Sequence, residues 1–324
     1  VRQCVWQEQE AADAESEEEG EAASEEAARE GEVAGERECK FVVRDLMTGR
    51  SEDAALGLLA KIGLDDLESF GWLLTKGDQA VVEEFRKHGS QEDLDNLEYV
   101  LNGVGCDPQW IPPHVKKQIE KGQYHGGSLG PHDFDAGHDG LTLEHFLQHP
   151  HSRISRLQRP HVLALRLYTT SSFARINTPL RVGTSPHPFA MTVFYISDGI
   201  KRLRAVSATL SPKEFNVELY LYRGMKDMRL LEGDDGFMAH GGTELGAMST
   251  TGSREIAFKY ADSNRPLVFR CKTRGLGRGC SVKFLSVFPL EEEYLYPPLT
   301  FLQPESYQET SEGHTMVDIT PQMS

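Results

Sequence analysis

The chain has 324 residues and a formal net charge of −16, and this length suffices for one large domain or two smaller ones with a sizeable buried core. The charge is concentrated: residues 1–39 hold 14 Asp or Glu against 3 Lys or Arg, a net of −11, which leaves −5 for the other 285 residues. No basic stripe stands out, so nucleic-acid binding is disfavoured. No run of 18 apolar residues exists that could span a membrane.

Residues 1–39 form an acidic segment that we expect to be disordered. Glu, Ala, Gly and Ser dominate it, and Trp6 is its one aromatic residue, so it cannot bury enough apolar surface to fold. The chain begins at Val1 without a methionine, which leaves room for an upstream segment, and its N-terminus shows no apolar signal core. A cytoplasmic location is favoured over a secreted one.

The five cysteines are odd in number and scattered, which does not predict a disulfide framework. Cys271 and Cys280 flank one expected hairpin and could meet across it. Two reduced thiols are favoured, because disulfides are rare in the cytosol.

Residues 40–103 are expected to be a helical accessory region. Four helical patterns begin near Ser51, at Asp65 or Asp66, at Gln79 and at Ser90, each with leucines or other apolar residues at helical spacing. The region holds no motif that indicates chemistry. Residues 104–140 are rich in Pro, Gly and His and predict a linker.

Two patterns that imitate metal sites lie next along the chain. Residues 135–146 resemble a calcium loop, but Phe146 stands where a bidentate glutamate is needed. A loop leading into a helix capped at Thr142 is therefore favoured. His145 and His149 lie four apart on that helix without a third ligand, which favours solvated histidines over a metal site.

From residue 160 the pattern becomes helices followed by strands. Residues 161–181 predict a helix that ends in a polar turn, and residues 189–204 predict a second helix with basic residues in its last turn. Four strand-like runs follow, at 215–223, 244–251, 266–273 and 280–290. This order predicts an α+β domain built on antiparallel pairing.

A glycine-rich segment between the last two runs superficially matches a dinucleotide-binding loop. Gly275, Gly277 and Gly279 follow a strand-like run, yet a Rossmann fingerprint has to open a helix, because the pyrophosphate sits on the helix N-terminus. Here the glycines lead into another strand-like run. They are expected to form a hairpin turn.

Three separated features point to a different kind of nucleotide site. In LYLYRGM, Arg223 ends an apolar strand, where an arginine is costly unless it meets an anion such as phosphate or a nearby acid. In GAMSTTGSREIAFKYA, Ser249, Thr250 and Thr251 close a strand and Ser253 caps a helix. Each feature alone has an ordinary structural explanation, a salt bridge for the first and a good helix cap for the second.

The third feature is FPLEEEYLYPPL, with three consecutive glutamates before two prolines. In an extended segment alternate side chains share a face, so Glu291 and Glu293 would point one way and Glu292 the other. Two carboxylates on one face, followed by the rigid pair Pro297–Pro298, suit the presentation of acids to a ligand.

The ordered set resembles the R-S-E motif of mono-ADP-ribosyltransferases, in the arginine-modifying branch related to clostridial and ecto-enzymes. The resemblance covers about residues 142–305, with 26 residues from Arg223 to Ser249 and 44 from Ser249 to Glu293. It implies an ADP-ribosyltransferase-like fold with a helical lobe and two antiparallel-rich packed sheets that form an NAD cleft. It also implies a catalytic domain at 141–305, a C-terminal tail at 306–324, and NAD as substrate with no metal.

The resemblance further implies a set of NAD contacts. Arg223 would hold the NAD phosphates or the adjoining ribose, and the backbone of Gly224 would bond to the nicotinamide amide. Thr250 would lie on the floor of the cleft, and Tyr260 would lie against the nicotinamide. Ser249 would orient the catalytic glutamate and so belongs to both the catalytic and the cofactor-binding set, as Arg223 does.

Glu293 would be the catalytic carboxylate, in contact with the cofactor, and Glu291 would recognise or deprotonate the acceptor guanidinium. The chemistry agrees: nicotinamide leaves as a neutral molecule, so the site has to stabilise positive charge on the ribose, which a preplaced carboxylate does. The arriving arginine is protonated, and a second carboxylate attracts it and can take its proton.

Two departures and two alternatives accompany this hypothesis. Thr251 stands where the family motif Ser-Thr-Ser has its second serine. Because three glutamates are consecutive, the motif could be aligned on them in two ways one residue apart, and the distance to Pro297–Pro298 selects Glu291 and Glu293. The first alternative is an NAD glycohydrolase with water as acceptor. The second is an inactive NAD-binding module. The expected partners are NAD and a protein with an exposed arginine, and the sequence does not indicate which protein.

Overall fold

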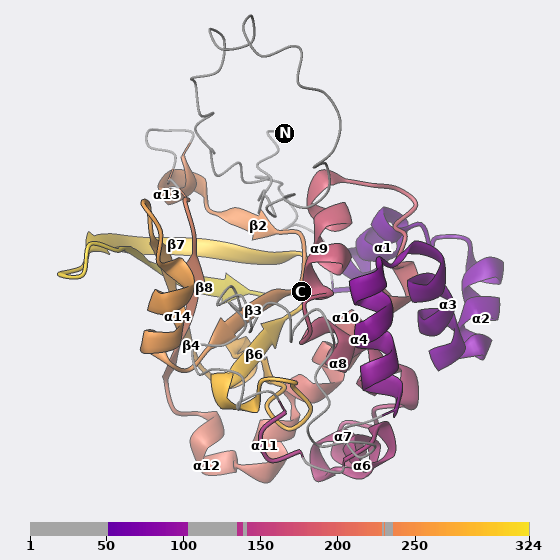
Figure 1. The fold of residues 1–324 in the computed structure, drawn as a ribbon. Helices are drawn as coiled ribbons and strands as arrows, with labels where there is room; N and C mark the ends of the chain where they lie inside the picture. The colour runs from indigo at the N-terminus through magenta and orange to yellow at the C-terminus, as the bar shows by residue number, and fades with distance from the viewer. Residues whose placement is uncertain (1–50, 103–134, 139–140, 229, 231–235, 324) are drawn as a thin grey trace, which may run out of the picture.

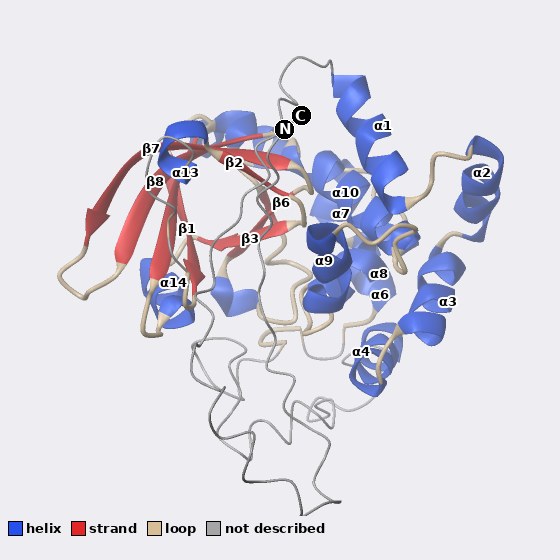
Figure 2. Ribbon diagram, turned by 90° about the horizontal axis from the view of Figure 1, so that it is seen from above, coloured by secondary structure: helices blue, strands red, loops and turns tan. Residues whose placement is uncertain are grey.

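The computed structural model describes residues 51–102, 135–138, 141–228, 230 and 236–323. The predicted disordered tail at 1–39 and all of the predicted linker except 135–138 lie outside these residues. Helices occupy the first part of the described chain and strands the last part (Figure 1). Seen from above, most helices gather on one side of the molecule and the strands on the other (Figure 2).

Four helices precede the gap at 103–134 and lie in the described part, residues 51–102, of the region expected to be helical. They are α1 (Ser51–Ile62), α2 (Leu67–Lys76), α3 (Asp78–His88) and α4 (Gln91–Asn102). Asp66 caps α2, because its side chain accepts from the backbone N–H groups of Glu68 and Ser69. Each observed start lies within one residue of an expected one.

The helices after the gap build a central lobe. They are α6 (Leu143–Gln148), α7 (Pro150–Ile154), α8 (Arg159–Tyr168), α9 (Phe173–Val182), α10 (Ala190–Arg204), α11 (Val206–Leu210) and α12 (Pro212–Phe215). The helix predicted over 161–181 is in fact α8, a polar turn and α9. Thr169 Oγ1 donates to Arg166 O at 2.8 Å and Thr170 Oγ1 donates to Leu167 O at 2.6 Å, so hydroxyls compete with the helical pattern where α8 ends.

The N-terminal helices share one hydrophobic core with this lobe. Phe85 of α3, Val100 of α4 and Leu163 of α8 belong to the same buried cluster. Glu84 of α3 also accepts hydrogen bonds from the backbone N–H groups of Met191 and Thr192, at 2.6 and 2.9 Å, which caps the N-terminus of α10. The region 51–102 is therefore packed into the fold.

Eight strands of the described chain form one hydrogen-bonded sheet in the order β2-β7-β8-β4-β1-β3-β6-β5. They are β1 (Leu219–Met225), β2 (Gly242–Glu244), β3 (Met248–Thr251), β4 (Leu267–Thr273), β5 (Cys280–Ser281), β6 (Glu293–Tyr296), β7 (Thr300–Glu309) and β8 (Thr315–Gln322). The pairings are antiparallel except for β4 with β8, which is parallel. Short helices α13 (Phe237–His240) and α14 (Arg254–Ala261) lie between strands.

The α+β class is confirmed. The two expected sheets are present as two parts of one hydrogen-bonded sheet. A five-stranded part, β2-β7-β8-β4-β1, meets a three-stranded part, β3-β6-β5, through the single register pair Tyr222–Thr251. The hydrogen bonds thus run through both parts as one sheet. This junction lies where the motif residues gather.

One strand prediction and the tail prediction are wrong. The run 280–290 is a strand only at Cys280–Ser281 and then turns, ending in a 3₁₀ helix at Pro289–Glu291. The C-terminal tail predicted at 306–324 instead supplies the end of β7 and all of β8. β8 lies between β4 and β7, so these residues belong to the same sheet as the motif strands.

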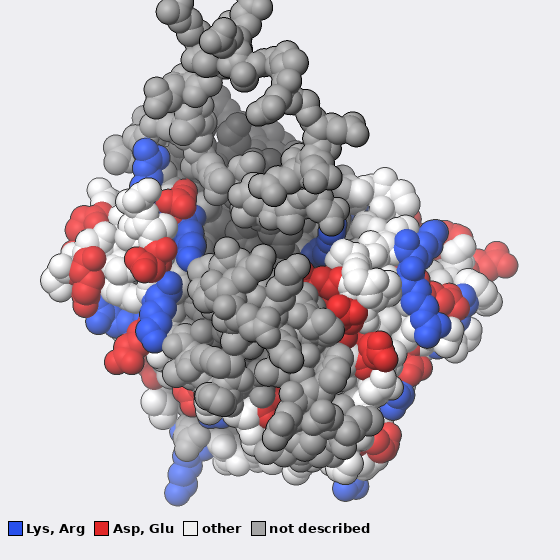
Figure 3. All heavy atoms as spheres, viewed as in Figure 1, with Lys and Arg blue, Asp and Glu red and all other residues white. Residues whose placement is uncertain are grey.

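Cys271 and Cys280 are both buried free thiols, as expected. Within the described residues, none of the helices has the length and apolar character needed to cross a membrane. Lys and Arg are interspersed with Asp and Glu over the described parts of the face shown in Figure 3.

Candidate active site

Three neighbouring strands bring the motif residues together. Arg223 lies on β1, Ser249 on β3 and Glu293 on β6, and these strands are adjacent in the sheet. The register pairs Tyr222 with Thr251 and Thr251 with Glu293. Residues separated by 70 positions in the sequence therefore meet at the junction between the two parts of the sheet.

A hydrogen bond and the electrostatics of Glu293 connect the three residues. Arg223 Nη1 donates to the backbone oxygen of Ser249 at 2.9 Å, and the Ser249 hydroxyl and the Arg223 charge both lower the pKa of Glu293. Arg223 lies inside β1, two residues before its end, and is partly buried, and its guanidinium is held by a neighbouring strand. The arrangement places one cation and one carboxylate on either side of a serine.

Glu293 is a buried carboxylate, with 8% of its surface exposed. Burial raises its pKa from an ordinary 4.5 to about 7, while hydrogen bonds from Ser249 and Ser286 and the charge of Arg223 act in the opposite direction. Ser286 Oγ lies 3.5 Å from Glu293 Oε2. A carboxylate held in this way is costly for the fold, which is typical of functional positions.

The glutamate run has the expected exposure for a different reason from the one predicted. Glu291 ends a 3₁₀ helix and Glu292 has the left-handed backbone φ 50°, ψ 48°, so the segment is not extended and simple alternation does not apply. The left-handed residue turns the chain between the two outer glutamates. Glu292 is exposed and pairs with Lys283 at 2.9 Å, whereas Glu293 is buried and Glu291 is half-buried.

Glu291 is electrostatically coupled to Glu293. Its pKa is raised to about 7, first by burial and then by the charge of Glu293, and a hydrogen bond from Tyr260 opposes this. Tyr260 Oη donates to Glu291 Oε1 at 2.8 Å. Thr251 Oγ1 donates to the backbone oxygen of Glu291 at 2.6 Å, which ties the turn to β3.

Gly224 lies where α14 crosses β1. A Cβ at this position would lie 1.8 Å from the backbone oxygen of Ala257 and 2.8 Å from the backbone nitrogen of Ala261. The absence of a side chain lets α14, which carries Tyr260, pack directly on the strand that carries Arg223.

The remaining motif residues connect β6 to its neighbouring strands. Thr250 is buried and its Oγ1 donates to the backbone oxygen of Tyr294 at 2.9 Å, bridging β3 and β6. Pro297 begins the tight turn into β7, in which Thr300 Oγ1 donates to Pro297 O at 2.7 Å and Leu299 has φ 67°. This geometry fixes the end of β6, as the proline pair predicted.

A buried ion pair stands behind this turn. Arg181 Nε lies 3.1 Å from Glu244 Oε1, and both side chains are buried. Leu299 N donates to Glu244 O at 2.9 Å and Gly246 N to Glu244 Oε1 at 3.0 Å. No sequence pattern indicates this pair, because its members lie 63 residues apart.

Ser286, Thr251 and the Tyr260–Glu291 hydrogen bond are the site features that motif reasoning missed. Ser286 lies in a run that alternates like a strand, so its burial beside Glu293 has no signal in the sequence. In the motif, Thr251 is only a departure from the usual serine. In the structure, the hydroxyl of Thr251 donates a hydrogen bond to the backbone oxygen of Glu291 and so holds the turn that carries this glutamate.

The described residues contain no group of three or more His, Cys, Asp or Glu side chains able to hold a metal ion. Asp135, the first residue of the calcium-like loop, is buried against Arg166. The favoured helix is confirmed as α6, with Thr142 as its N-cap.

Comparisons with known proteins give structural likenesses only. No protein-family model matches the sequence, and no curated protein does. The solved structures to which the chain is similar include the ADP-ribosyltransferase HopU1 of Pseudomonas syringae pv. Tomato DC3000, at 18% identity and a TM-score of 0.44, covering 72% of this chain and 97% of that one. Another is an ADP-ribosyltransferase from Clostridium botulinum, at 20% identity and a TM-score of 0.40, covering 52% of this chain and 89% of that one.

Exoenzyme S from Pseudomonas aeruginosa, in complex with human 14-3-3 protein beta and bound to carba-NAD, is also similar, at 17% identity and a TM-score of 0.40, covering 64% of this chain and 88% of that one. Two of these three structures are named as ADP-ribosyltransferases, the family that the motifs resemble. TM-scores below 0.5 establish neither activity nor acceptor, so the residues themselves carry the functional proposal.

Proposed function

We propose that this protein is an NAD-dependent mono-ADP-ribosyltransferase that modifies arginine side chains of proteins and releases nicotinamide. The observation that carries the proposal is the meeting of Arg223, Ser249 and Glu293 on three adjacent strands, where Arg223 donates to Ser249 O and both residues lower the pKa of Glu293. A cation for phosphate and a buried carboxylate for a developing positive charge are the two groups that cleavage of NAD at the ribose requires.

Glu293 supplies the electrostatic stabilisation. Departure of neutral nicotinamide leaves positive charge on the ribose, and an ionised carboxylate bonded to a ribose hydroxyl lowers the energy of that state. The hydroxyl of Ser249 and the charge of Arg223 favour the ionised form of Glu293 against the effect of burial. Both therefore prepare the carboxylate before NAD binds.

Glu291 is proposed to handle the acceptor. A pKa raised to about 7 makes this carboxylate a stronger base than an ordinary glutamate. Once ionised it attracts a guanidinium, and it can take the proton that the guanidinium nitrogen loses as the new C–N bond forms. Tyr260 and Thr251 hold it in place.

The remaining assignments concern NAD. Arg223 is proposed to bind the phosphates or the adjoining ribose, and the backbone of Gly224 the nicotinamide amide. Thr250 forms part of the floor, and the ring of Tyr260 is proposed to lie against nicotinamide while its hydroxyl holds Glu291. Gly224 packs closely against α14, the helix that carries Tyr260. The two residues proposed to contact nicotinamide are therefore on neighbouring elements.

Incubation with NAD and agmatine, a small guanidine, tests the proposal. We expect ADP-ribosylagmatine and an equal amount of nicotinamide. Free ADP-ribose as the main product would indicate an NAD glycohydrolase instead. NAD binding without any nicotinamide release would indicate an inactive binding module.

A further inference from the structure

The chain segment 282–288, between β5 and the 3₁₀ turn, is held against the helical lobe. Leu285, Ser286 and Val287 are each fully buried in it. Leu285 and Val287 belong to the hydrophobic cluster of the lobe, and Ser286 lies between them. A hydroxyl is thus kept at a fixed place in the interior, next to Glu293.

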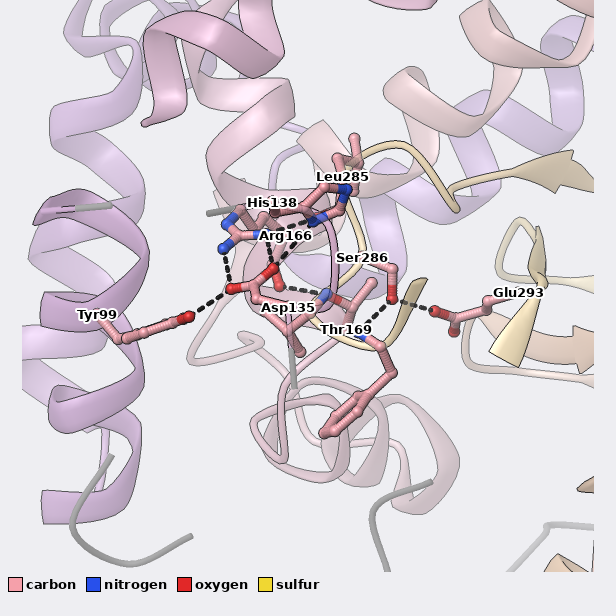
Figure 4. A network of polar contacts seen from close by, with 10 residues as sticks. Tyr99, Asp135, His138, Arg166, Thr169, Leu285, Ser286 and Glu293 are labelled. Atoms are coloured by element: carbon pink, nitrogen blue, oxygen red, sulfur yellow. Dashed lines mark hydrogen bonds and ion pairs between the residues drawn. The ribbon is translucent and has the colours of Figure 1, made fainter. Parts of the chain in front are cut away.

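The main chain on both sides of Ser286 is bonded to the lobe. Arg166 Nη1 donates to Leu285 O at 2.9 Å, Val287 N donates to Thr169 Oγ1 at 3.1 Å, and Asp135 N donates to Val287 O at 2.7 Å (Figure 4). Three hydrogen bonds from two segments therefore fix the two residues that flank the serine.

The arginine that makes one of these bonds is itself fixed by a buried acid. Arg166 has no exposed surface and Asp135 is 2% exposed. Both guanidinium Nη atoms donate to the carboxylate, with Nη1 at 3.0 Å. Asp135 also accepts from Tyr99 Oη of α4 and contacts His138 Nδ1 at 3.0 Å (Figure 4). A buried pair with this many bonds has one arrangement, and loss of a member is costly.

The hydroxyl of Ser286 takes part in two hydrogen bonds. Its Oγ accepts from the backbone N–H of Phe288 at 3.0 Å. Its proton is donated to the carboxylate oxygen Oε2 of Glu293 at 3.5 Å, which is long for such a bond. Figure 4 shows this contact between Ser286 and Glu293.

We propose that Ser286 is a second positioning residue for Glu293, and that the buried Asp135–Arg166 pair keeps it in place through the main chain of Leu285 and Val287. The inference rests on the proposed function in one respect, that Glu293 is the catalytic carboxylate. Through Tyr99, it also gives the N-terminal helices a part in the site.

Other charged or titratable groups also face Glu293, and they too influence its pKa. They are Arg223 from β1, Glu291 from the 3₁₀ turn, Tyr168 from α8 and Cys280 from β5. None of them changes in the variants below. A difference in the titration of Glu293 is then attributable to Ser286 and its supports.

The direct test is the pH titration of Glu293 by carboxyl ¹³C NMR on the full chain, with Glu293→Gln to identify its signal. We expect Ser286→Ala to raise the pKa of Glu293 by about half a unit to one unit, because a bond to the charged form is lost. Ser286→Thr, which keeps the hydroxyl, should restore the original value. An unchanged titration in Ser286→Ala overturns the proposal.

Ser152→Ala is the matched control. Ser152 is also fully buried, and its hydroxyl donates to the backbone oxygen of Phe146 at 2.7 Å. Its loss should lower stability as Ser286→Ala does and leave the Glu293 titration alone. An equal pKa change in both variants would assign the effect to general loosening and overturn the proposal.

A double-mutant cycle tests the supports and remains informative if Ser286→Ala folds poorly. Thr169→Val removes the acceptor for Val287 N, and Asp135→Asn removes the charge that fixes Arg166. Each should raise the pKa of Glu293, and neither should raise it further once Ser286 is alanine. Destabilisation with no change in the titration would overturn the part assigned to Asp135 and Thr169.

Activity gives a second readout that separates this inference from the proposed function. Ser286→Ala should lower kcat about 3- to 10-fold at pH 7, leave KM for NAD nearly unchanged and move the acidic limb of the profile to higher pH. Absence of NAD cleavage by the unaltered protein would refute the proposed function, and the NMR titration would still decide the role of Ser286.

Discussion

Replacing Glu293 with glutamine tests, without any substrate, how much the buried carboxylate lowers the free energy of unfolding. The pKa of Glu293 is about 7 against an ordinary 4.5 because the carboxylate is buried, and this difference corresponds to about 3 kcal/mol. The folded state holds the proton more tightly than the unfolded state. Unfolding therefore releases protons between these two pH values, and the free energy of unfolding falls as the pH rises through that window.

The pH dependence of Glu293→Gln follows from this sign. At pH 8.5 the ionised carboxylate costs most of the 3 kcal/mol, and at pH 5 it costs less than about 1 kcal/mol. We expect the variant to gain about 1–3 kcal/mol of unfolding free energy relative to the unaltered protein between pH 5 and 8.5. Urea unfolding at both pH values, followed by circular dichroism, measures this difference.

Glu292→Gln is the control for this experiment. Glu292 is the next residue in the chain, receives the same substitution, and is exposed beside Lys283, so its loss should have a small effect that is similar at both pH values. If Glu293→Gln and the unaltered protein lose stability in parallel from pH 5 to 8.5, burial does not raise the pKa of Glu293 as described.

Three further predictions concern the acceptor side and the packing of the site. Glu291→Gln should abolish ADP-ribosylation of agmatine while nicotinamide release into water continues, and product analysis by mass spectrometry showing unchanged transfer would remove Glu291 from the acceptor role. Tyr260→Phe removes the bond at 2.8 Å to Glu291 that lowers its pKa, so the acidic limb of the transfer rate should move up by about half a pH unit; an unmoved limb would show that the bond does not tune the acid. Gly224→Ala should lower stability by at least about 2 kcal/mol, because its Cβ would lie 1.8 Å from a backbone oxygen of α14. The control Gly277→Ala has no atom within 4 Å of its Cβ and should leave the Tm nearly unchanged in a thermal melt. Equal Tm values for the two variants would contradict the close packing of α14 on β1.

The motif residues are predictable because local sequence fixes them. Arg223 after an apolar run, Ser249 at the start of a run of small hydroxyl residues and Glu293 before two prolines are each marked by a short pattern. No single pattern predicts that these residues meet on neighbouring strands. That expectation comes from the resemblance of the ordered set to a known family. The α+β class follows from the order of helices and strands.

The exposure of the glutamates is predicted correctly from an incorrect cause. Alternation assumes an extended chain, and the chain at Glu291 and Glu292 turns through a 3₁₀ helix and a left-handed residue. No glycine or asparagine marks the left-handed position, so the turn has no signal in the sequence.

The features that sequence reasoning missed depend on contacts distant in the chain. Arg166 meets Asp135 and Leu285 across 31 and 119 positions, and the parallel pairing of β8 with β4 brings the last residues of the chain into the sheet. The outer half of β7 is exposed on both faces, so it shows no alternation and its sequence is typical of a tail. Pairing partners cannot be obtained from such a pattern.

The most direct measurement is nicotinamide release from NAD in the presence of agmatine, compared between the unaltered protein, Glu293→Ala and Glu292→Ala. We predict ADP-ribosylagmatine from the unaltered protein, at least about a 100-fold lower rate for Glu293→Ala, and a nearly normal rate for Glu292→Ala. Equal rates for the unaltered protein and Glu293→Ala would contradict the claim that the Arg223–Ser249–Glu293 junction is an ADP-ribosyltransferase active site.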